Sequence, residues 1–274
     1  MRHEKENMRN RTIEKWSLLL PAALLCLSSQ ALATPFVINV NFTGGLTASQ
    51  QSVFTTAANT WMSLLPNYQT GIAISPLTIN ASGANIDGAG GILGSAGPNS
   101  IVSRAGFWLA ATGSMQFDTA DLTNLESNGS LNAVIMHEMA HVMGFGTLWT
   151  NNNVYVNGTG QFTGSNALSA YRTEFNLPAA AFVPVELGGG SGTANGHWDE
   201  VDGGGAATGR VSALGDMQYE LMTGWLNSSI FISKTTVQSF VDIGFASAAD
   251  VPEPTTLASA AAGALLLLCF KRLS

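Results

Sequence analysis

Cysteine is almost missing from this chain of 274 residues. Its two cysteines, Cys26 and Cys269, lie in apolar segments close to the two ends, and residues 34–250 contain none. Disulfide bonds therefore cannot hold the central region together, so its stability has to come from a hydrophobic core and from any metal that it binds. The length allows one sizeable domain or two small ones.

Basic residues are also scarce. The whole chain carries a net charge of −7, and residues 34–250 contain four basic side chains against fourteen acidic ones, a net charge of about −10. A surface of this sign repels nucleic acid, so we exclude DNA and RNA as partners. The composition favours a soluble extracellular protein.

Histidine occurs only four times, and three of the four form a pattern. His137 and His141 lie in the segment His137–Gly144, which reads H-E-x-x-H-x-x-G, and His197 follows 56 residues after His141. The fourth, His3, lies in an N-terminal segment that we expect to be removed. Every histidine of the central region is therefore a candidate metal ligand.

The spacing of the first two histidines suits a helix. Residues four apart lie one above the other on the same helix face, so both imidazoles can bind one ion. Glu138 then points beside the metal, where it can take a proton from a zinc-bound water and pass it to a leaving amine. A chance match on an ordinary amphipathic helix is the alternative. A catalytic zinc needs three protein ligands, so the motif predicts one more ligand elsewhere.

We expect the third ligand to be His197, in Gly196-His197-Trp198. An exposed histidine in a glycine-rich loop is the alternative, and Asp199, Glu200 or Glu220 would then complete the site; a glutamate would give a His₂Glu set. The acidic block at 199–203 has the composition of a calcium loop. It matches no defined one, and we interpret it as a solvated turn.

Residues 1–33 are typical of a secretory signal peptide. Basic residues precede an apolar run from Trp16 to Leu27, and Ala31-Leu32-Ala33 has the small-x-small pattern of a cleavage site. We expect cleavage after Ala33. The alternative is an uncleaved membrane anchor, but the run is short for a span of about 20 residues.

Residues 251–274 resemble the PEP-CTERM sorting signal of Gram-negative bacteria. They contain Pro252-Glu253-Pro254, an apolar stretch from Leu257 to Phe270 and the basic pair Lys271-Arg272. The resemblance implies recognition by exosortase-type machinery at the inner membrane, removal of the segment, and export to the outer surface or extracellular matrix. A plain membrane tail is the alternative; the short apolar run fits a transient membrane contact better.

Hydrophobic periodicity predicts strands and helices between the two ends. We expect strands at 36–42, 72–79, 107–110 and 115–118, helices at 47–65 and 235–243, and short strands and turns over 81–97. After Gly146 the regular patterns fade.

The motif helix has its own predicted ends. Ser130 is a plausible N-cap, and Gly144 suits the left-handed residue that ends such a helix. Between them, one set of apolar side chains is expected to face the core: Leu131, Ile135, Met139 and Val142.

This order of elements, with the H-E-x-x-H helix before an irregular second half, resembles the metzincin zinc proteases. Most metzincins place the third histidine three residues after the glycine, where this chain has Thr147. Leishmanolysin-like proteases place it some sixty residues later, as His197 is placed. Met222, in the segment 220–224, is similar to the family's Met-turn methionine, which packs beneath the metal; an ordinary core methionine is the alternative.

Two departures from that family stand out. The protozoan enzymes are rich in disulfides and are held latent by a propeptide cysteine, which is impossible in a central region without cysteine. Gly224 stands where some metzincins have an additional tyrosine ligand.

The sequence and the resemblance together predict an α+β fold of metzincin type, with a mixed twisted sheet, an active-site helix and an irregular C-terminal subdomain. The domain would span 34–250, with subdomains 34–146 and 147–250. The resemblance implies a secreted zinc endopeptidase in which His137, His141 and His197 bind Zn²⁺ and Glu138 is general base and acid.

The partners expected of such a protein are a protein or peptide substrate and the sorting machinery, and we expect a monomer. The substrate would lie along an edge strand, which we place at 91–97. A non-catalytic surface or matrix binding protein on the same fold is the alternative. The intact Glu138 argues against it.

Overall fold

The structure is a computed structural model that describes residues 33–200 and 206–250. The predicted signal peptide, apart from Ala33, and the predicted sorting signal at 251–274 lie outside the described residues, as do positions 201–203 of the acidic block. Within the described part of the chain, no helix combines the length and apolarity needed to cross a membrane.

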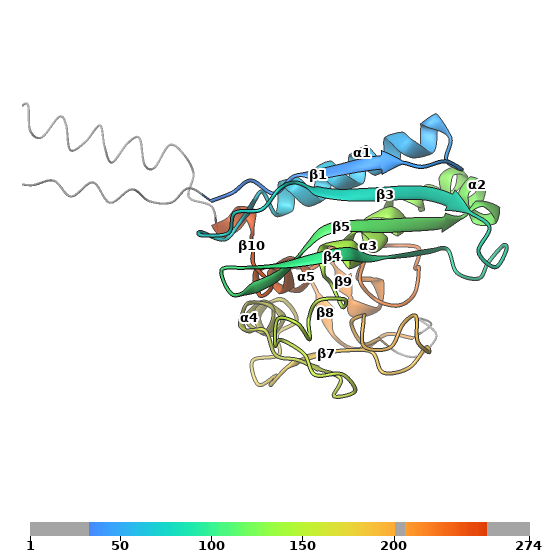
Figure 1. Cartoon of the computed structure of the whole chain (residues 1–274). Helices are drawn as coiled ribbons and strands as arrows, with labels where there is room; N and C mark the ends of the chain where they lie inside the picture. The colour runs from blue at the N-terminus through green and yellow to red at the C-terminus, as the bar shows by residue number, and fades with distance from the viewer. Residues whose placement is uncertain (1–32, 201–205, 251–274) are drawn as a thin grey trace, which may run out of the picture. The chain divides into compact units, whose positions relative to one another are not determined.

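A mixed sheet of four strands forms the N-terminal half (Figure 1). In spatial order its strands are β1 (Ile38–Phe42), β3 (Leu77–Ala84), β5 (Phe107–Asp118) and β4 (Gly94–Arg104). β1, β3 and β5 run parallel, whereas β4 pairs antiparallel with β5 and forms one edge. The combination of this sheet with helices is compatible with the predicted α+β class.

Two predicted strands have different bounds in the structure. The strand expected at 72–79 begins only at Leu77, because Pro76 has no N–H to donate to a neighbouring strand. The edge expected at 91–97 belongs to β4 from Gly94 onward, and this strand continues to Arg104.

The segments expected at 107–110 and 115–118 are one continuous strand, β5, which includes Gly113. A Cβ at Gly113 would lie 2.3 Å from Cγ1 of Val142 in helix α3 (Leu131–Met143). The glycine therefore lets the motif helix approach the sheet more closely than any other residue would.

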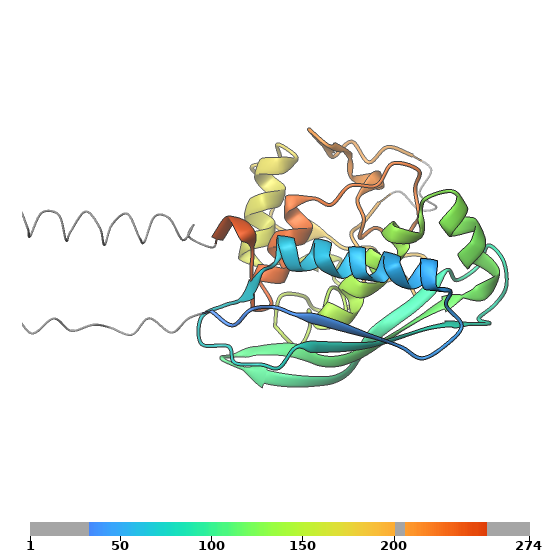
Figure 2. The same ribbon diagram turned by 90° about the horizontal axis from the view of Figure 1, so that it is seen from above.

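Helices α1 (Ala48–Leu64) and α3 cover the same face of the sheet (Figure 2). A capping box of Thr47 and Gln50 begins α1, and the helix ends just before Pro66, as predicted. The indole Nε1 of the buried Trp61 donates to the backbone oxygen of Met136, at 3.0 Å. This bond ties α1 to the motif helix.

Both ends of α3 lie where the sequence predicts them. Ser130 is the N-cap residue, but its side chain makes no capping bond; its hydroxyl donates to Oδ1 of Asn128. Gly144 ends the helix with a positive φ of 122°, which favours glycine. The predicted core residues of α3 are all buried: Leu131, Ile135, Met139 and Val142. The short helix α2 (Thr119–Ser127), which leads into α3, was not predicted.

The C-terminal half is irregular, as predicted, but it contains more short elements than the sequence indicates. These are β6 (Gln161–Phe162), α4 (Ser165–Glu174), β7 (Val183–Pro184), β8 (Val211–Ser212), β9 (Gly215–Asp216), a 3₁₀ turn (Met217–Tyr219), α5 (Lys234–Val241), β10 (Phe245–Ala246) and a second 3₁₀ turn at 248–250. The predicted helix at 235–243 corresponds to α5, and β10 pairs antiparallel with β2 (Asn67–Tyr68).

Two carboxylates clamp α4 and α5 together. Glu174, the last residue of α4, accepts hydrogen bonds from the backbone N–H groups of Lys234 and Thr235 at the start of α5. Asp242, just after α5, accepts from the N–H groups of Asn166 and Ala167 at the start of α4. Each helix is thus followed or ended by a carboxylate that binds the first N–H groups of the other, and a negative charge at a helix N-terminus is stabilising.

A cluster of buried aromatic rings supports the loop that follows β7. Trp149 and Trp198 stack with centroids 5.1 Å apart, and Phe145 and Phe162 pack edge-on against Trp198. The indole Nε1 of Trp198 donates to Oγ1 of Thr236, at 2.8 Å. Trp198 is therefore fixed on several sides, and so is the residue before it, His197.

Candidate metal centre

Three histidine side chains from two separate segments meet at one point. Nε2 of His137 lies 3.0 Å from Nε2 of His141 and 3.0 Å from Nε2 of His197, and the third separation is 3.1 Å. His137 and His141 stand one turn apart on α3, and His197 comes from the loop after β7. Among the described residues, these three form the one group of three or more histidine, cysteine or carboxylate side chains that could hold a metal ion.

The other ring nitrogen of each histidine faces a backbone carbonyl. Nδ1 lies 2.8 Å from the oxygen of Leu221 for His137, 3.0 Å from that of Phe145 for His141, and 2.8 Å from that of Thr193 for His197. A carbonyl can only accept, so each Nδ1 carries the hydrogen and each Nε2 presents a lone pair. Three lone pairs about 3 Å apart repel one another, and a shared cation removes that repulsion.

Burial keeps the imidazoles neutral. Desolvation lowers the pKa of His137, and desolvation followed by the neighbouring imidazoles lowers the pKa of His141 well below 6.5 and that of His197 to about 3. Neutral imidazole is the form that binds metals, so the cluster is in its ligand form at neutral pH. His141 and His197 are buried, whereas His137 is half-buried.

Backbone hydrogen bonds hold the His197 loop on both of its flanks. The N–H of Glu186 donates to the oxygen of His197 at 3.0 Å, and the N–H of Trp198 donates to the oxygen of Met222 at 3.0 Å. The loop therefore lies between β7 and the segment around Met222.

Gly146 lets the chain leaving α3 pass close to the same loop. Its φ is 70°, and a Cβ at this position would lie 2.6 Å from the backbone oxygen of Gly196. The end of the motif helix and the residue before His197 are thus in direct backbone contact, which fixes the third histidine relative to the first two.

Glu138 is buried beside the edge of the sheet. Its Cγ lies 3.1 Å from the point where a Cβ would stand on Gly94, the first residue of β4. Desolvation raises the pKa of Glu138 to about 8. A cation held by the neighbouring histidines would act in the opposite direction, because it favours the carboxylate.

Met222 is fully buried, in a turn that Glu220 anchors. The Glu220 carboxylate accepts hydrogen bonds from the N–H of Met222, from the N–H and hydroxyl of Ser233, and from the hydroxyl of Thr236. The residue between them, Leu221, supplies the carbonyl that orients His137. Glu220 is therefore committed to the turn and does not belong to the histidine cluster.

The other alternative ligands are placed elsewhere too. Asp199 pairs with Arg210 at 2.6 Å, and the hydroxyl of Thr147 donates to the backbone oxygen of His141. Glu200 is 4% exposed, so the interpretation of residues 199–203 as a solvated turn is wrong for this residue. Trp198, two residues earlier, is fully buried, and this holds the chain at Glu200 close to the interior.

Sequence reasoning missed the groups that orient the ligands. The three carbonyl oxygens at Leu221, Phe145 and Thr193 belong to the backbone, so no residue type marks them. Glu220 had one signal, its place two residues before Met222 in the segment that resembles the Met-turn, which favours a structural role over that of a ligand.

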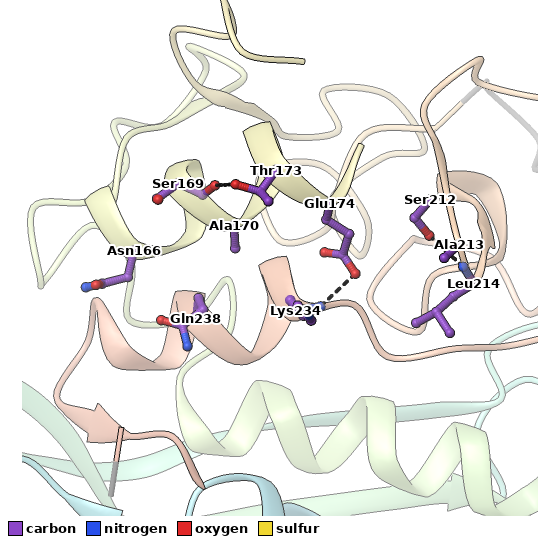
Figure 3. A pocket seen from close by; sticks show the side chains of 10 residues that line it. All are labelled: Asn166, Ser169, Ala170, Thr173, Glu174, Ser212, Ala213, Leu214, Lys234 and Gln238. Atoms are coloured by element: carbon purple, nitrogen blue, oxygen red, sulfur yellow. Dashed lines mark hydrogen bonds between the residues drawn. The ribbon is translucent and has the colours of Figure 1, made fainter. Parts of the chain in front are cut away.

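A pocket of about 570 Å³ lies apart from the histidines, between α4, α5 and the segment linking β8 to β9 (Figure 3). Glu174 and Lys234 both line it, but the Glu174 carboxylate accepts the backbone N–H of Lys234 and so is committed to capping α5. None of its lining residues is a histidine, and we assign the chemistry to the histidine cluster.

No protein-family model matches the sequence, and no curated protein matches it. The functional argument therefore depends on the geometry of the cluster and on the motifs of the chain.

Proposed function

We propose that this protein is a zinc-dependent endopeptidase of metzincin type, similar to the leishmanolysin-like proteases. One observation carries the proposal: three neutral imidazoles point their Nε2 lone pairs at one spot, and Glu138 follows the first of them on the same helix. If the three histidines only stabilised the fold, at least one Nε2 would carry a hydrogen and donate it to another Nε2.

Zinc is the metal that this donor set fits best. Tetrahedral coordination with Zn–N distances of about 2.0–2.1 Å separates two ligand nitrogens by about 3.3 Å. The observed separations are 3.0–3.1 Å, so a small outward movement of the rings accommodates the ion. Three protein ligands leave a fourth position free, and His137 is the least buried of the three histidines.

The chemistry divides between the ion and Glu138. Zinc, when bound, supplies a Lewis acid that polarises a peptide carbonyl and makes a nearby water more acidic. Glu138 takes a proton from the attacking water and delivers it to the nitrogen of the leaving amine, so that one carboxylate serves both transfers. The backbone carbonyls bonded to the three Nδ1 atoms keep the rings oriented during these steps.

The edge strand β4 is the place where we propose that an extended substrate binds. Its outer side has no neighbouring strand among the described residues, so its backbone groups are available to a peptide that adds to the sheet. Because Gly94 touches Glu138, a peptide along residues 94–97 would bring a peptide bond next to that carboxylate. We therefore propose a protein or peptide as the substrate.

The metzincin assignment draws on two further features. His197 reaches the cluster from a loop far along the chain, as in the leishmanolysin-like group, and Met222 is buried in a turn bonded to both the His197 loop and, through Leu221, to His137. We further propose that the protein is exported as a monomer, that exosortase-type machinery removes residues 251–274, and that the product resides at the outer surface or in the matrix.

The test compares the purified protein, loaded with zinc, with Glu138→Gln on a protein substrate such as casein and on a peptide library. We expect Glu138→Gln to lose about 10²–10⁴-fold in kcat/KM while it keeps the same zinc content, because this residue moves protons and is not a ligand. Phenanthroline should stop the wild type, and added zinc should restore it.

Two results would contradict the proposal. Near-normal turnover of Glu138→Gln would remove the proposed base. A wild type that holds zinc but cleaves no protein or peptide would favour the alternative, a surface or matrix protein that binds its partner without hydrolysis.

A further inference from the structure

Glu186 and Glu200 are two buried carboxylates behind the His197 loop. Each is 4% exposed, and three of their four carboxylate oxygens have no well-formed hydrogen bond: Oε2 of Glu186 and both oxygens of Glu200. The fourth, Oε1 of Glu186, accepts from the N–H of Gly188. Burying an unpaired carboxylate is costly, so such groups normally have a proton or a cation as partner.

The charge of Glu186 acts on Glu200. Desolvation raises the pKa of Glu200 to about 7, and the negative charges of Glu186 and Asp199 add to that effect. The one salt bridge among the described residues is between Arg210 and Asp199, so no basic side chain there neutralises the pair.

Nearby hydrogen-bond donors do not satisfy the pair either. The hydroxyl of Thr223 and the N–H of Gly224 favour the charged form of Glu200, but neither makes a well-formed hydrogen bond to it. The Thr223 hydroxyl already donates to the backbone oxygen of Glu220 at 3.0 Å. A Cβ on Gly224 would lie 3.7 Å from Oε1 of Glu200, so this oxygen lies close to the backbone of the turn that follows Met222.

We propose that Glu186 and Glu200 bind a divalent cation, Ca²⁺, at a second site behind the histidine cluster. The available donors are carboxylate oxygens, which are hard ligands, and neither histidine nor cysteine is among them. Calcium accepts such sets in irregular geometry and completes them with backbone carbonyls and water, whereas magnesium demands a near-ideal octahedron. Zinc prefers the nitrogen donors of the histidine cluster.

The position of the pair indicates what the ion does. Glu186 bonds through its backbone to His197 and to Asn195, and Glu200 lies against the turn that follows Met222. A cation shared by the two carboxylates joins β7, the His197 loop and that turn. It therefore stabilises the segment that holds the third histidine, and it does so whether or not the protein is a peptidase.

The experiment uses the purified protein with its zinc content held constant and calcium removed on a chelating resin before the titration. Calcium at about 100 times its Kd should raise the Tm by about 5–10 °C. Terbium should bind at the same place, with emission sensitised by the nearby Trp198, and calcium should displace it.

The variants Glu186→Gln and Glu200→Gln keep the shape of each side chain and remove its charge, and both should lose the calcium-dependent rise in Tm. The matched control is Asp199→Asn, which removes the neighbouring carboxylate that already has Arg210 as partner. This variant should keep the rise.

Three outcomes would overturn the proposal. The first is a wild type whose Tm does not respond to calcium and whose terbium emission calcium does not displace, a result that needs no variant to fold. The second is an unchanged calcium response in Glu200→Gln. The third combines two results: the Tm of the wild type does not respond to calcium, and Glu200→Gln has the same free energy of unfolding as the wild type at pH 7. Together they would show that Glu186 and Glu200 share a proton. Because none of these measurements uses activity, they are independent of the test of Glu138.

Discussion

Glu138 and Gly94 are in closer contact than a side chain at position 94 would permit. A Cβ on Gly94 would stand 3.1 Å from Cγ and 3.3 Å from Cδ of Glu138, and also 3.2 Å from the backbone oxygen of Gln116. The first residue of the edge strand therefore sets the distance between the sheet and the proposed proton carrier. Glycine at this position has a role that its backbone conformation alone does not require, since its φ is not positive.

Gly94→Ala should displace the Glu138 carboxylate and lower kcat/KM by about 10- to 100-fold, because small displacements of a catalytic group are costly. The zinc content should not change, since no histidine is touched. The control is Gly192→Ala, outside the proposed substrate stretch, where φ is not positive and an added Cβ meets no atom within 4 Å. Equal activity of the two variants would show that the contact at Gly94 is irrelevant to catalysis.

His197→Ala should bind zinc at least about 100-fold more weakly and lose activity in proportion, because two imidazoles remain where three are needed. Metal analysis after dialysis, together with turnover, measures both effects. Thr147→Val is the comparison, since this residue stands where most metzincins have their third ligand; it should keep the zinc. Full zinc occupancy in His197→Ala would move the third ligand elsewhere.

Asp118 should make stability depend on pH in the acid range. Hydrogen bonds from the backbone N–H groups of Ala120, Gly88, Asp87 and Ile86 lower the pKa of this carboxyl to about 2. Because the folded pKa lies below the ordinary value of 3.8, the stabilisation is complete above pH 4 and is lost as the pH falls towards 2.

Denaturant unfolding of the wild type and of Asp118→Asn measures this contribution. The wild type should be more stable at pH 6, and the difference between the two proteins should shrink between pH 4 and pH 2. A difference that stays constant over that interval would mean that the carboxylate charge is not what holds the loop at 86–88.

The mature protein should lack both ends of the chain. Intact mass spectrometry of protein recovered from the cell surface or matrix should find a chain that begins near Thr34 and ends near Pro252-Glu253-Pro254. Material that still carries Lys271-Arg272 would contradict removal by an exosortase and favour a stable membrane tail.

The meeting of His137 and His141 at one point could be predicted from the sequence, because helical spacing fixes their geometry without any tertiary information. His197 was predictable for a different reason, since no other histidine remains in the central region. The metzincin resemblance led to Met222, which the structure buries.

The missed helix α4 shows why other parts could not be predicted. Only Ala167 and Tyr171 of this helix are buried, which leaves too narrow an apolar stripe for the periodicity to be seen. Its start depends on Asp242, which comes 76 residues after Asn166. A cap supplied from so far along the chain has no local signature.

The edge strand β4 was only partly predicted for a related reason. It combines glycine, serine and asparagine with a proline, and register shifts beside Ser100 interrupt its pairing with β5. An alternating apolar pattern arises when one face of a strand is buried, and most of β4 is half-buried or exposed on both faces. β4 is a strand because it pairs with β5. The apolar residues of β5 did predict that β5 is a strand.

Because β10 pairs with β2, the fold cannot be completed before the C-terminal part of the domain has been synthesised. Phe245 lies opposite Tyr68 and packs edge-on against Phe36, with ring centroids 4.9 Å apart, so the last strand closes on the first residues of the domain. Ser233 and Thr236, which hold Glu220 and Trp198 in place, are also among the last residues to be made. If the protein is exported from its N-terminus as we propose, the histidine cluster stays incomplete until these residues have crossed the membrane, and we expect any metal to bind only after export.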